Sequence, residues 1–434
     1  MARVRLRGDR VIWFIVAVFA MISIIAVFSV GSFLVKNSPD IISKTSIYME
    51  QFGSVALGFA ALFVCYAVNY KFYKKISPYV FIISVVMLLM LFVPPLQDKR
   101  NGAVRGLKLM GHTIQVFEFV KVGLILFISW GLEKYSVEIQ TFKGFVVKLL
   151  VWVVAVCACI MVNSFSSAML LALVSMMLFY FMNVKVTHLL LTVGIAIALV
   201  AGLFGLYHIV PNADDISIFN RLGTVESRVQ HFIQPESDTT MDISKMTREQ
   251  LEDMDRDERQ SESAKIAIKA GGVFGKGVGN GIARHSLSMA FSDFIFASIV
   301  EETGLIGGIV IVLLYLIFLF RCIGLSFKCP DTFSQSLVLG LAFLITTQAF
   351  LHILVNVRLI PITGHTLPLI SHGGTAYLVL SAAFGMILSV SRTVNKMEEE
   401  RRAAEEAAAA EAETTEATAE TAPETTEQSN PEKK

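Results

Sequence analysis

Charged residues are scarce in this sequence: they occupy 17% of its 434 positions, whereas 54% of the positions are hydrophobic. Soluble globular domains usually contain about 25% charged residues. Apolar runs long enough to cross a hydrocarbon core of about 30 Å recur along most of the chain. This composition excludes an ordinary soluble protein and indicates one that crosses a membrane many times.

Cysteine motifs and a cleavage signal are also missing. The chain has five cysteines without C-x-x-C or metal-type spacing, so we expect them to be inert packing residues. The first apolar run, residues 11 to 35, is too long for the core of a secretory signal and has no obvious A-x-A cleavage site. It is therefore predicted to remain as the first membrane span.

The apolar runs predict an all-α polytopic membrane protein with about ten transmembrane helices. Basic residues in the short loops follow the positive-inside rule and predict that both termini are cytoplasmic. This orientation puts the large loop of residues 211–292, between spans 7 and 8, on the extracytoplasmic side. The predicted spans are centred on residues 11 to 35, 50 to 69, 79 to 96, 115 to 132, 146 to 163, 165 to 183, 187 to 210, 293 to 321, 335 to 356 and 368 to 391.

The ends of the chain differ from the ten-span domain, residues 11–392. Residues 1–10 form a basic N-terminus, and residues 393–434 form an acidic tail rich in Glu, Ala and Thr. The first part of the tail could extend the last span as a helix. The remainder has almost no apolar content to bury, so the tail is predicted to be largely disordered in the cytoplasm.

Two outer segments have unusual compositions. The segment "PPLQDKRNGAVRGLKLMGHT" holds four basic residues on the side where basic residues are normally rare, among them Arg105 and Lys108. They indicate either an anionic ligand or solvated side chains at headgroup level. The Gly-rich "GGVFGKGVGNG" has no preceding strand and no closing Lys-Ser/Thr, so a nucleotide loop is improbable. Its glycines favour tight turns and a close backbone approach to something at the membrane surface.

Ionisable groups inside a span are costly and normally face a cavity or a partner. Gln115, Glu118 and Lys121 are spaced three apart at the start of the fourth span, so they share a helix face and the two charges can pair. Such a pair either holds helices together or lines a polar groove for a ligand headgroup. The sequence leaves both readings open.

The segment "FSDFIFASIVEETG" places carboxylates where the eighth span begins. Asp293 is at its outer end, and Glu301 and Glu302 are more than two turns further in. Asp293 could simply cap the helix N-terminus. The loop "RLIPITGHTLPLISHGGTAYLVL" then leads into the last span, and irregular backbone at this depth must be covered by protein or water. Its His365 and His372 are predicted to form hydrogen bonds, because no carboxylate or third ligand is spaced with them for a metal.

With these motifs in order, the chain resembles the SEDS family of bacterial peptidoglycan glycosyltransferases, and its cell-division branch, FtsW, more closely than its elongation branch, RodA. The similarity rests on "NGAVRGLKLMGHTIQVFEFVK", "SRVQHFIQP", "GKGVGNG", "SDFIFASIVEETGLIGG" and "IPITGHTLPLISHGGTA". Departures include Gly106 for a usual Trp, Val116 for a usual Pro and Ser164 for a usual Asp. Asp293 keeps the position of the corresponding Asp in the family's motif.

This resemblance implies polymerisation of lipid II into β-1,4-linked glycan at the outer face of the bacterial cytoplasmic (inner) membrane, at the division septum. It implies Asp293 as the catalytic base. The alternatives are an elongation-type polymerase, a lipid II flippase or a non-catalytic division scaffold. The residues expected to bind substrate are Arg105, Lys108, Gln115, Glu118, Lys121, Arg228, Glu301, Glu302, Ser371, Gly373 and Gly374.

The family also suggests what the protein works with. The expected partner is a class B penicillin-binding protein, the transpeptidase that cross-links new strands, together with other division proteins and membrane lipid. No nucleic acid is expected. No cofactor is certain, but a divalent cation, Mg²⁺ or Mn²⁺, could hold the pyrophosphate of the substrate.

Overall fold

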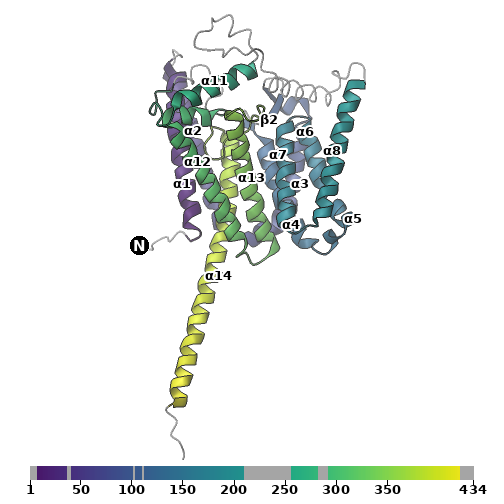
Figure 1. Ribbon diagram of the computed structural model, residues 1–434, viewed down its shortest axis with the longest axis vertical. Helices are drawn as coiled ribbons and strands as arrows, with labels where there is room; N and C mark the ends of the chain where they lie inside the picture. The colour runs from purple at the N-terminus through teal and green to yellow at the C-terminus, as the bar shows by residue number, and fades with distance from the viewer. Residues whose placement is uncertain are drawn as a thin grey trace, which may run out of the picture.

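The computed structural model describes residues 7–36, 41–100, 103–109, 112–209, 256–281 and 292–420. Long helices run side by side and form a bundle (Figure 1). In the described ranges, six helices are long and apolar enough to cross a membrane, and α2, α7 and α8 contribute shorter apolar stretches. The prediction of a helical polytopic membrane protein is confirmed, while the count of ten spans stays a prediction.

The first half of the described chain contains α1 (Arg10–Lys36), α2 (Ile41–Ala67), α3 (Tyr70–Met90), α4 (Val116–Lys134), α5 (Phe142–Phe145), α6 (Val151–Met161), α7 (Phe165–Phe181) and α8 (Val186–Ile209). A π-helical turn, Val146–Leu150, joins α5 to α6, and single 3-10 turns lie at Pro94–Leu96 and Glu138–Gln140. The second half contains α11 (Arg256–Gly271), α12 (Ile295–Ser326), α13 (Thr332–Asn356) and α14 (Gly374–Glu420).

The expectation of a purely α-helical protein is wrong at the basic loop. Strands β1 (Gln97–Arg100), β2 (Ala103–Leu109) and β3 (His112–Ile114) form an antiparallel sheet in the order β1-β2-β3. The sequence between β1 and β2 reads Asn-Gly, a dipeptide that favours tight hairpin turns, and this signal could have predicted the sheet.

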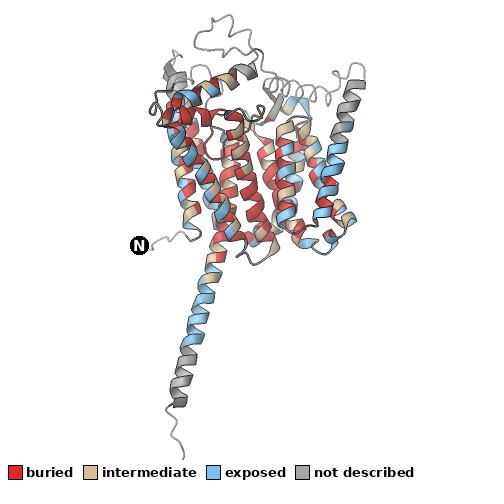
Figure 2. Ribbon diagram, viewed as in Figure 1, coloured by how far each residue is buried: buried red, intermediate tan, exposed pale blue. Residues whose placement is uncertain are grey.

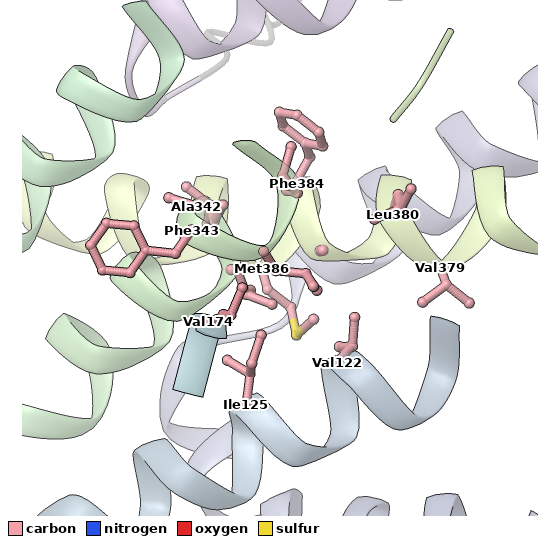
Figure 3. Packing of buried hydrophobic residues seen from close by; sticks show 14 of the residues in the cluster. Val122, Ile125, Val174, Ala342, Phe343, Val379, Leu380, Phe384 and Met386 are labelled. Atoms are coloured by element: carbon pink, nitrogen blue, oxygen red, sulfur yellow. The ribbon is translucent and has the colours of Figure 1, made fainter. Parts of the chain in front are cut away.

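Buried apolar residues from many helices form one core in the bundle, and Figure 2 shows the buried positions in red. Figure 3 shows Ile125 of α4 and Val174 of α7 close to Phe343 of α13 and Phe384 of α14, all of them buried. Helix α13 is therefore enclosed by protein along most of its length. Helices α1, α3 and α8 expose many large apolar side chains on the outside, as expected for surfaces that face lipid.

The last span continues into the first part of the acidic tail. Helix α14 extends beyond the bundle to Glu420, as the composition of that part allowed. Ala, Glu and Arg are strong helix formers, and the pairs Lys396–Glu400 and Arg401–Glu405 add i,i+4 contacts. This extension leaves the same end of the bundle as the start of α1, where Asp9 bonds to Ser391 of α14 (Figure 1). The predicted disorder of residues 421–434 lies outside the described residues.

Candidate active site

Asp293 lies in the turn immediately before α12, at the end of the bundle that carries the sheet and α11. Helix α12 begins at Ile295 and its N-cap position is Phe294, which makes no side-chain capping bond. Asp293 therefore does not occupy the cap position. Its side chain is half-buried, and its carboxylate accepts a hydrogen bond of 2.9 Å from the Ser292 hydroxyl.

Two residues from other elements fix this turn. The Asn356 side chain, at the end of α13, donates to the Asp293 carbonyl over 3.2 Å and accepts from the Ala297 amide over 3.0 Å. The Ser371 hydroxyl donates to the Ser292 carbonyl over 2.9 Å. The backbone on both sides of Asp293 is thus held from α13 and from the loop that precedes α14, which orients the carboxylate.

Helix α11 packs against the same turn. Ala264 and Ala267 of α11 pack against Phe294 and Ala297. An ion pair between Glu262 of α11 and Arg358, just after α13, ties the two elements together. The last helix before Asp293 in the described chain therefore belongs to the support of the site.

The part of the irregular loop 357–373 that runs from Leu367 to Ser371 is buried in the protein, as irregular backbone at membrane depth must be. Side chains from α1, α2, α7, α12 and α13 form hydrogen bonds with the loop, and four of these bonds satisfy loop carbonyl groups. Four hydrogen bonds end at loop carbonyls: Ser23 donates to Ile370, Ser166 to Thr363, Tyr315 to Pro368 and His352 to His365. In the fifth, His372 donates to the side-chain oxygen of Gln51.

The predicted pair of Glu118 and Lys121 is present and deeply buried. The Lys121 ammonium lies 2.7 Å from a Glu118 oxygen and 2.6 Å from the side-chain oxygen of Gln348 on α13. Gln348 in turn donates to the Thr366 carbonyl of the irregular loop over 3.2 Å. Lys121 is only 1% exposed, so it reaches the site through Gln348 and the loop and not by facing a ligand itself.

The histidines of the irregular loop are placed for hydrogen bonding, as predicted. Nδ1 of His372 lies 2.6 Å from Gln51, and His365 is buried. Burial, followed by the nearby Lys121 ammonium, lowers the pKa of His365 to about 3, so its imidazole is neutral at pH 7. Among the described residues no group of three or more His, Cys, Asp and Glu side chains could hold a metal ion. Binding of a divalent ion stays a prediction.

The remaining predicted residues are spread around this centre. The Gln115 amide donates to the Thr375 hydroxyl in the first turn of α14, beside Gly373 and the exposed Gly374. Lys108 is exposed on β2. Arg105 is on the same strand with its side chain outside the described residues, and Arg228 lies outside them altogether.

Glu301 and Glu302 are enclosed by protein, about two turns into α12. Glu301 pairs with Lys276 of the Gly-rich segment at 2.8 Å, and Glu302 accepts a hydrogen bond from Ser29 of α1. Both carboxylates therefore contact the protein itself, in agreement with a role in orienting the helix.

A family model described as cell cycle protein, covering FtsW, RodA and SpoVE, matches residues 9–396. The chain belongs to the FtsW/RodA/SpoVE family. A relative from Trichlorobacter lovleyi, named probable peptidoglycan glycosyltransferase FtsW, is 26% identical over 386 residues, which are 88% of this chain and 93% of the relative. A relative of the same name from Caulobacter vibrioides is 28% identical over 312 residues, 72% and 71% of the two chains.

Solved structures agree with this FtsW/RodA/SpoVE fold. A chain from a peptidoglycan synthase complex, described as coordinating polymerization and crosslinking, superimposes with a TM-score of 0.63 at 19% identity and covers 89% of this chain and 98% of its own. Thermus thermophilus RodA superimposes with a TM-score of 0.57 at 19% identity, covering 89% and 97%. These similarities establish the helical bundle of the family for this chain.

Sequence reasoning missed Asn356, which supports Asp293, and Gln348, which joins Lys121 to the irregular loop. Asn356 and Gln348 are buried polar side chains on the apolar helix α13. A buried polar side chain in a spanning helix normally needs a partner, and this signal was available in the sequence. Their partners, however, lie on other elements and could not be read from spacing.

Proposed function

We propose that the protein is a peptidoglycan glycosyltransferase that polymerises lipid II into β-1,4-linked glycan strands during cell division. The observation that carries the proposal is the half-buried Asp293 carboxylate, held in a fixed turn by Asn356 and Ser371 at one end of a membrane bundle. The similarity to relatives named probable peptidoglycan glycosyltransferase FtsW supports the same activity.

Asp293 acts in this proposal as the general base. Its carboxylate takes the proton from the acceptor 4-hydroxyl while that oxygen attacks the anomeric carbon of the donor and the bond to pyrophosphate breaks. Pyrophosphate leaves without needing a general acid, so one carboxylate is enough for inversion, unlike the pair used by inverting glycosidases. The fixed turn supports this role because it places the base before the substrate arrives.

Positive charge near the leaving pyrophosphate is proposed to come from outer-side residues. Lys108 is exposed and could therefore contact the pyrophosphate. Arg105 and Arg228 are the other candidates. The burial of Lys121 favours a positioning role for it instead. A Mg²⁺ or Mn²⁺ ion bound mainly by pyrophosphate oxygens would supply further charge stabilisation.

The setting of the reaction is also proposed. The protein is a multi-pass membrane protein, and we place Asp293 at the outer face with both termini in the cytoplasm, at the septum. A class B penicillin-binding protein is the proposed partner. The similar complex whose description couples polymerization with crosslinking supports this partnership.

The decisive experiment is polymerisation of purified lipid II by the detergent-solubilised protein, with and without that partner, comparing wild type with Asp293→Asn at matched thermal stability. We expect the rate to fall at least about 100-fold in the variant, because the base is lost while the side-chain shape is kept. Equal rates would exclude Asp293 as the base. No glycan from either protein, even with the partner, would favour the flippase or the scaffold.

A further inference from the structure

Helix α12 is interrupted at Gly304, and the Gly-rich segment Gly271–Gly281 lies against the interruption. Gly304 has φ 76° and ψ −175°, far outside the helical region. In a continuous helix the amides of Leu305 and Ile306 would donate to the carbonyls of Glu301 and Glu302, four residues back.

The Gly-rich segment replaces those helical bonds with its own backbone. The Leu305 and Ile306 amides donate to the carbonyls of Gly272 and Val273, over 2.9 and 3.4 Å. The Glu301 and Glu302 carbonyls accept from the amides of Lys276 and Gly277, over 3.0 and 2.9 Å. Four hydrogen bonds to the segment thus take the place of two within the helix.

An ion pair and two glycines accompany the backbone hydrogen bonds between the Gly-rich segment and α12. The Lys276 ammonium pairs with Glu301, which is 2% exposed. A Cβ atom on Gly275 would lie 2.2 Å from the Glu302 carbonyl oxygen, and one on Gly304 would lie 2.2 Å from the Val273 carbonyl oxygen. Both glycines also have positive φ, which residues with side chains rarely adopt.

The pairing lies inside a predicted membrane span, where water cannot satisfy free backbone groups. Residue 304 is nine positions beyond the start of α12, about 14 Å along the helix. Val273 and Phe274 of the segment expose their apolar side chains, as does Leu305 on the helix beside them. Because unpaired N–H and C=O groups are costly in lipid, the interruption and the segment stabilise each other.

We propose that the Gly-rich segment is a backbone splint that fixes the short helix of residues 295–303, and that Lys276 and Gly304 are positioning residues for the reaction. The short helix follows directly from the turn that carries Asp293, so its direction sets where that carboxylate points. This inference rests on the proposed function, because the positioned group is the proposed base.

The first test uses Lys276→Met, with Lys269→Met as the matched control. Lys269 is an exposed lysine in the last turn of α11 and forms no ion pair with the other described residues. Lys276→Met leaves the Glu301 carboxylate without this ammonium, which loosens the splint. We expect kcat for lipid II polymerisation to fall about 10- to 100-fold with KM changed less than about threefold. Lys269→Met should match wild type.

A rescue experiment distinguishes a positioning role of Lys276 from a simple loss of the fold. The double variant Lys276→Met/Glu301→Gln removes both charges together and should recover kcat to within about threefold of wild type. Gly304→Ala should lower kcat as Lys276→Met does, whereas Gly324→Ala should not, because a Cβ at Gly324 in the same helix meets nothing within 4 Å.

Hydrogen exchange of the Leu305 and Ile306 amides gives a readout that does not depend on activity. We expect exchange at least about tenfold faster in Lys276→Met than in Lys269→Met. Wild-type kcat and unchanged exchange in both Lys276→Met and Gly304→Ala would overturn the splint. If wild type makes no glycan, the proposed function and the positioning role fail, whereas faster exchange in Lys276→Met would still support the splint itself.

Discussion

Replacing Lys121 by Met tests whether the buried pair with Glu118 supports the fold or binds a substrate headgroup. The side chains have similar length, so the substitution removes the charge with little change in volume. It leaves a Glu118 carboxylate that is 7% exposed and a Gln348 oxygen that is fully buried, both of which had accepted hydrogen bonds from the ammonium.

The expected cost follows from those two groups. Breaking a buried ion pair costs about 3–5 kcal/mol, and an unsatisfied buried amide oxygen adds about 1–3 kcal/mol. The sum is about 4–8 kcal/mol. At about 2.1 cal/mol/K for each residue, 434 residues give an unfolding entropy of about 0.9 kcal/mol/K, so Tm should fall by about 4–9 °C.

Thermal unfolding in detergent measures this effect. Lys396→Met is the control, because Lys396 and Glu400 form an exposed pair worth no more than about 1 kcal/mol and its Tm should change by about 1 °C or less. The double variant Lys121→Met/Glu118→Gln should recover most of the loss, since it leaves no lone charge. A Lys121→Met protein with wild-type Tm but a raised KM for lipid II would refute the structural role.

Further predictions concern the support of Asp293, acid stability, the metal and the tail. Asn356→Ala removes the amide that holds the Asp293 carbonyl, so kcat for lipid II should fall about tenfold or more at similar KM, as measured by steady-state kinetics. The pKa of His365 is about 3 in the folded state and about 6.5 when unfolded, so the unfolded chain binds the extra proton between these values and stability is lost as pH falls from about 6.5 toward 3. The Tm of His365→Gln should therefore fall less between pH 7 and pH 5 than that of wild type. EDTA should lower the polymerisation rate, and added Mg²⁺ or Mn²⁺ should restore it. Deleting residues 403–434 should leave both Tm and rate unchanged, because the described part of that segment projects away from the bundle.

The lengths of the apolar runs predicted the helix bounds well where a span is one uninterrupted apolar run. The predicted span of 165 to 183 corresponds to α7, Phe165–Phe181, and that of 335 to 356 ends where α13 ends. The last span was placed six residues early, at 368 and not at Gly374. Pro368 and two consecutive glycines keep that stretch irregular although it is apolar.

The support of the site could not be predicted in the same way. The interruption at Gly304 is hidden inside one apolar run, and the groups that complete it lie about 30 residues earlier. Sequence spacing predicted the Glu118–Lys121 pair because its members share one helix. The contacts of Lys276 and Asn356 join separate elements, so they depend on how the whole chain packs.

The length of α14 has a mechanical consequence. Its 47 residues make one helix of about 70 Å, which starts beside Gln115 near the Asp293 end and continues well past the opposite end of the bundle. Such a rod acts as a lever arm: a tilt of about 5° around Gly374 would move Glu420 by about 6 Å. If α14 tilted at the Asp293 end, the displacement would therefore be larger at the far end, where a partner bound to the helix would detect it.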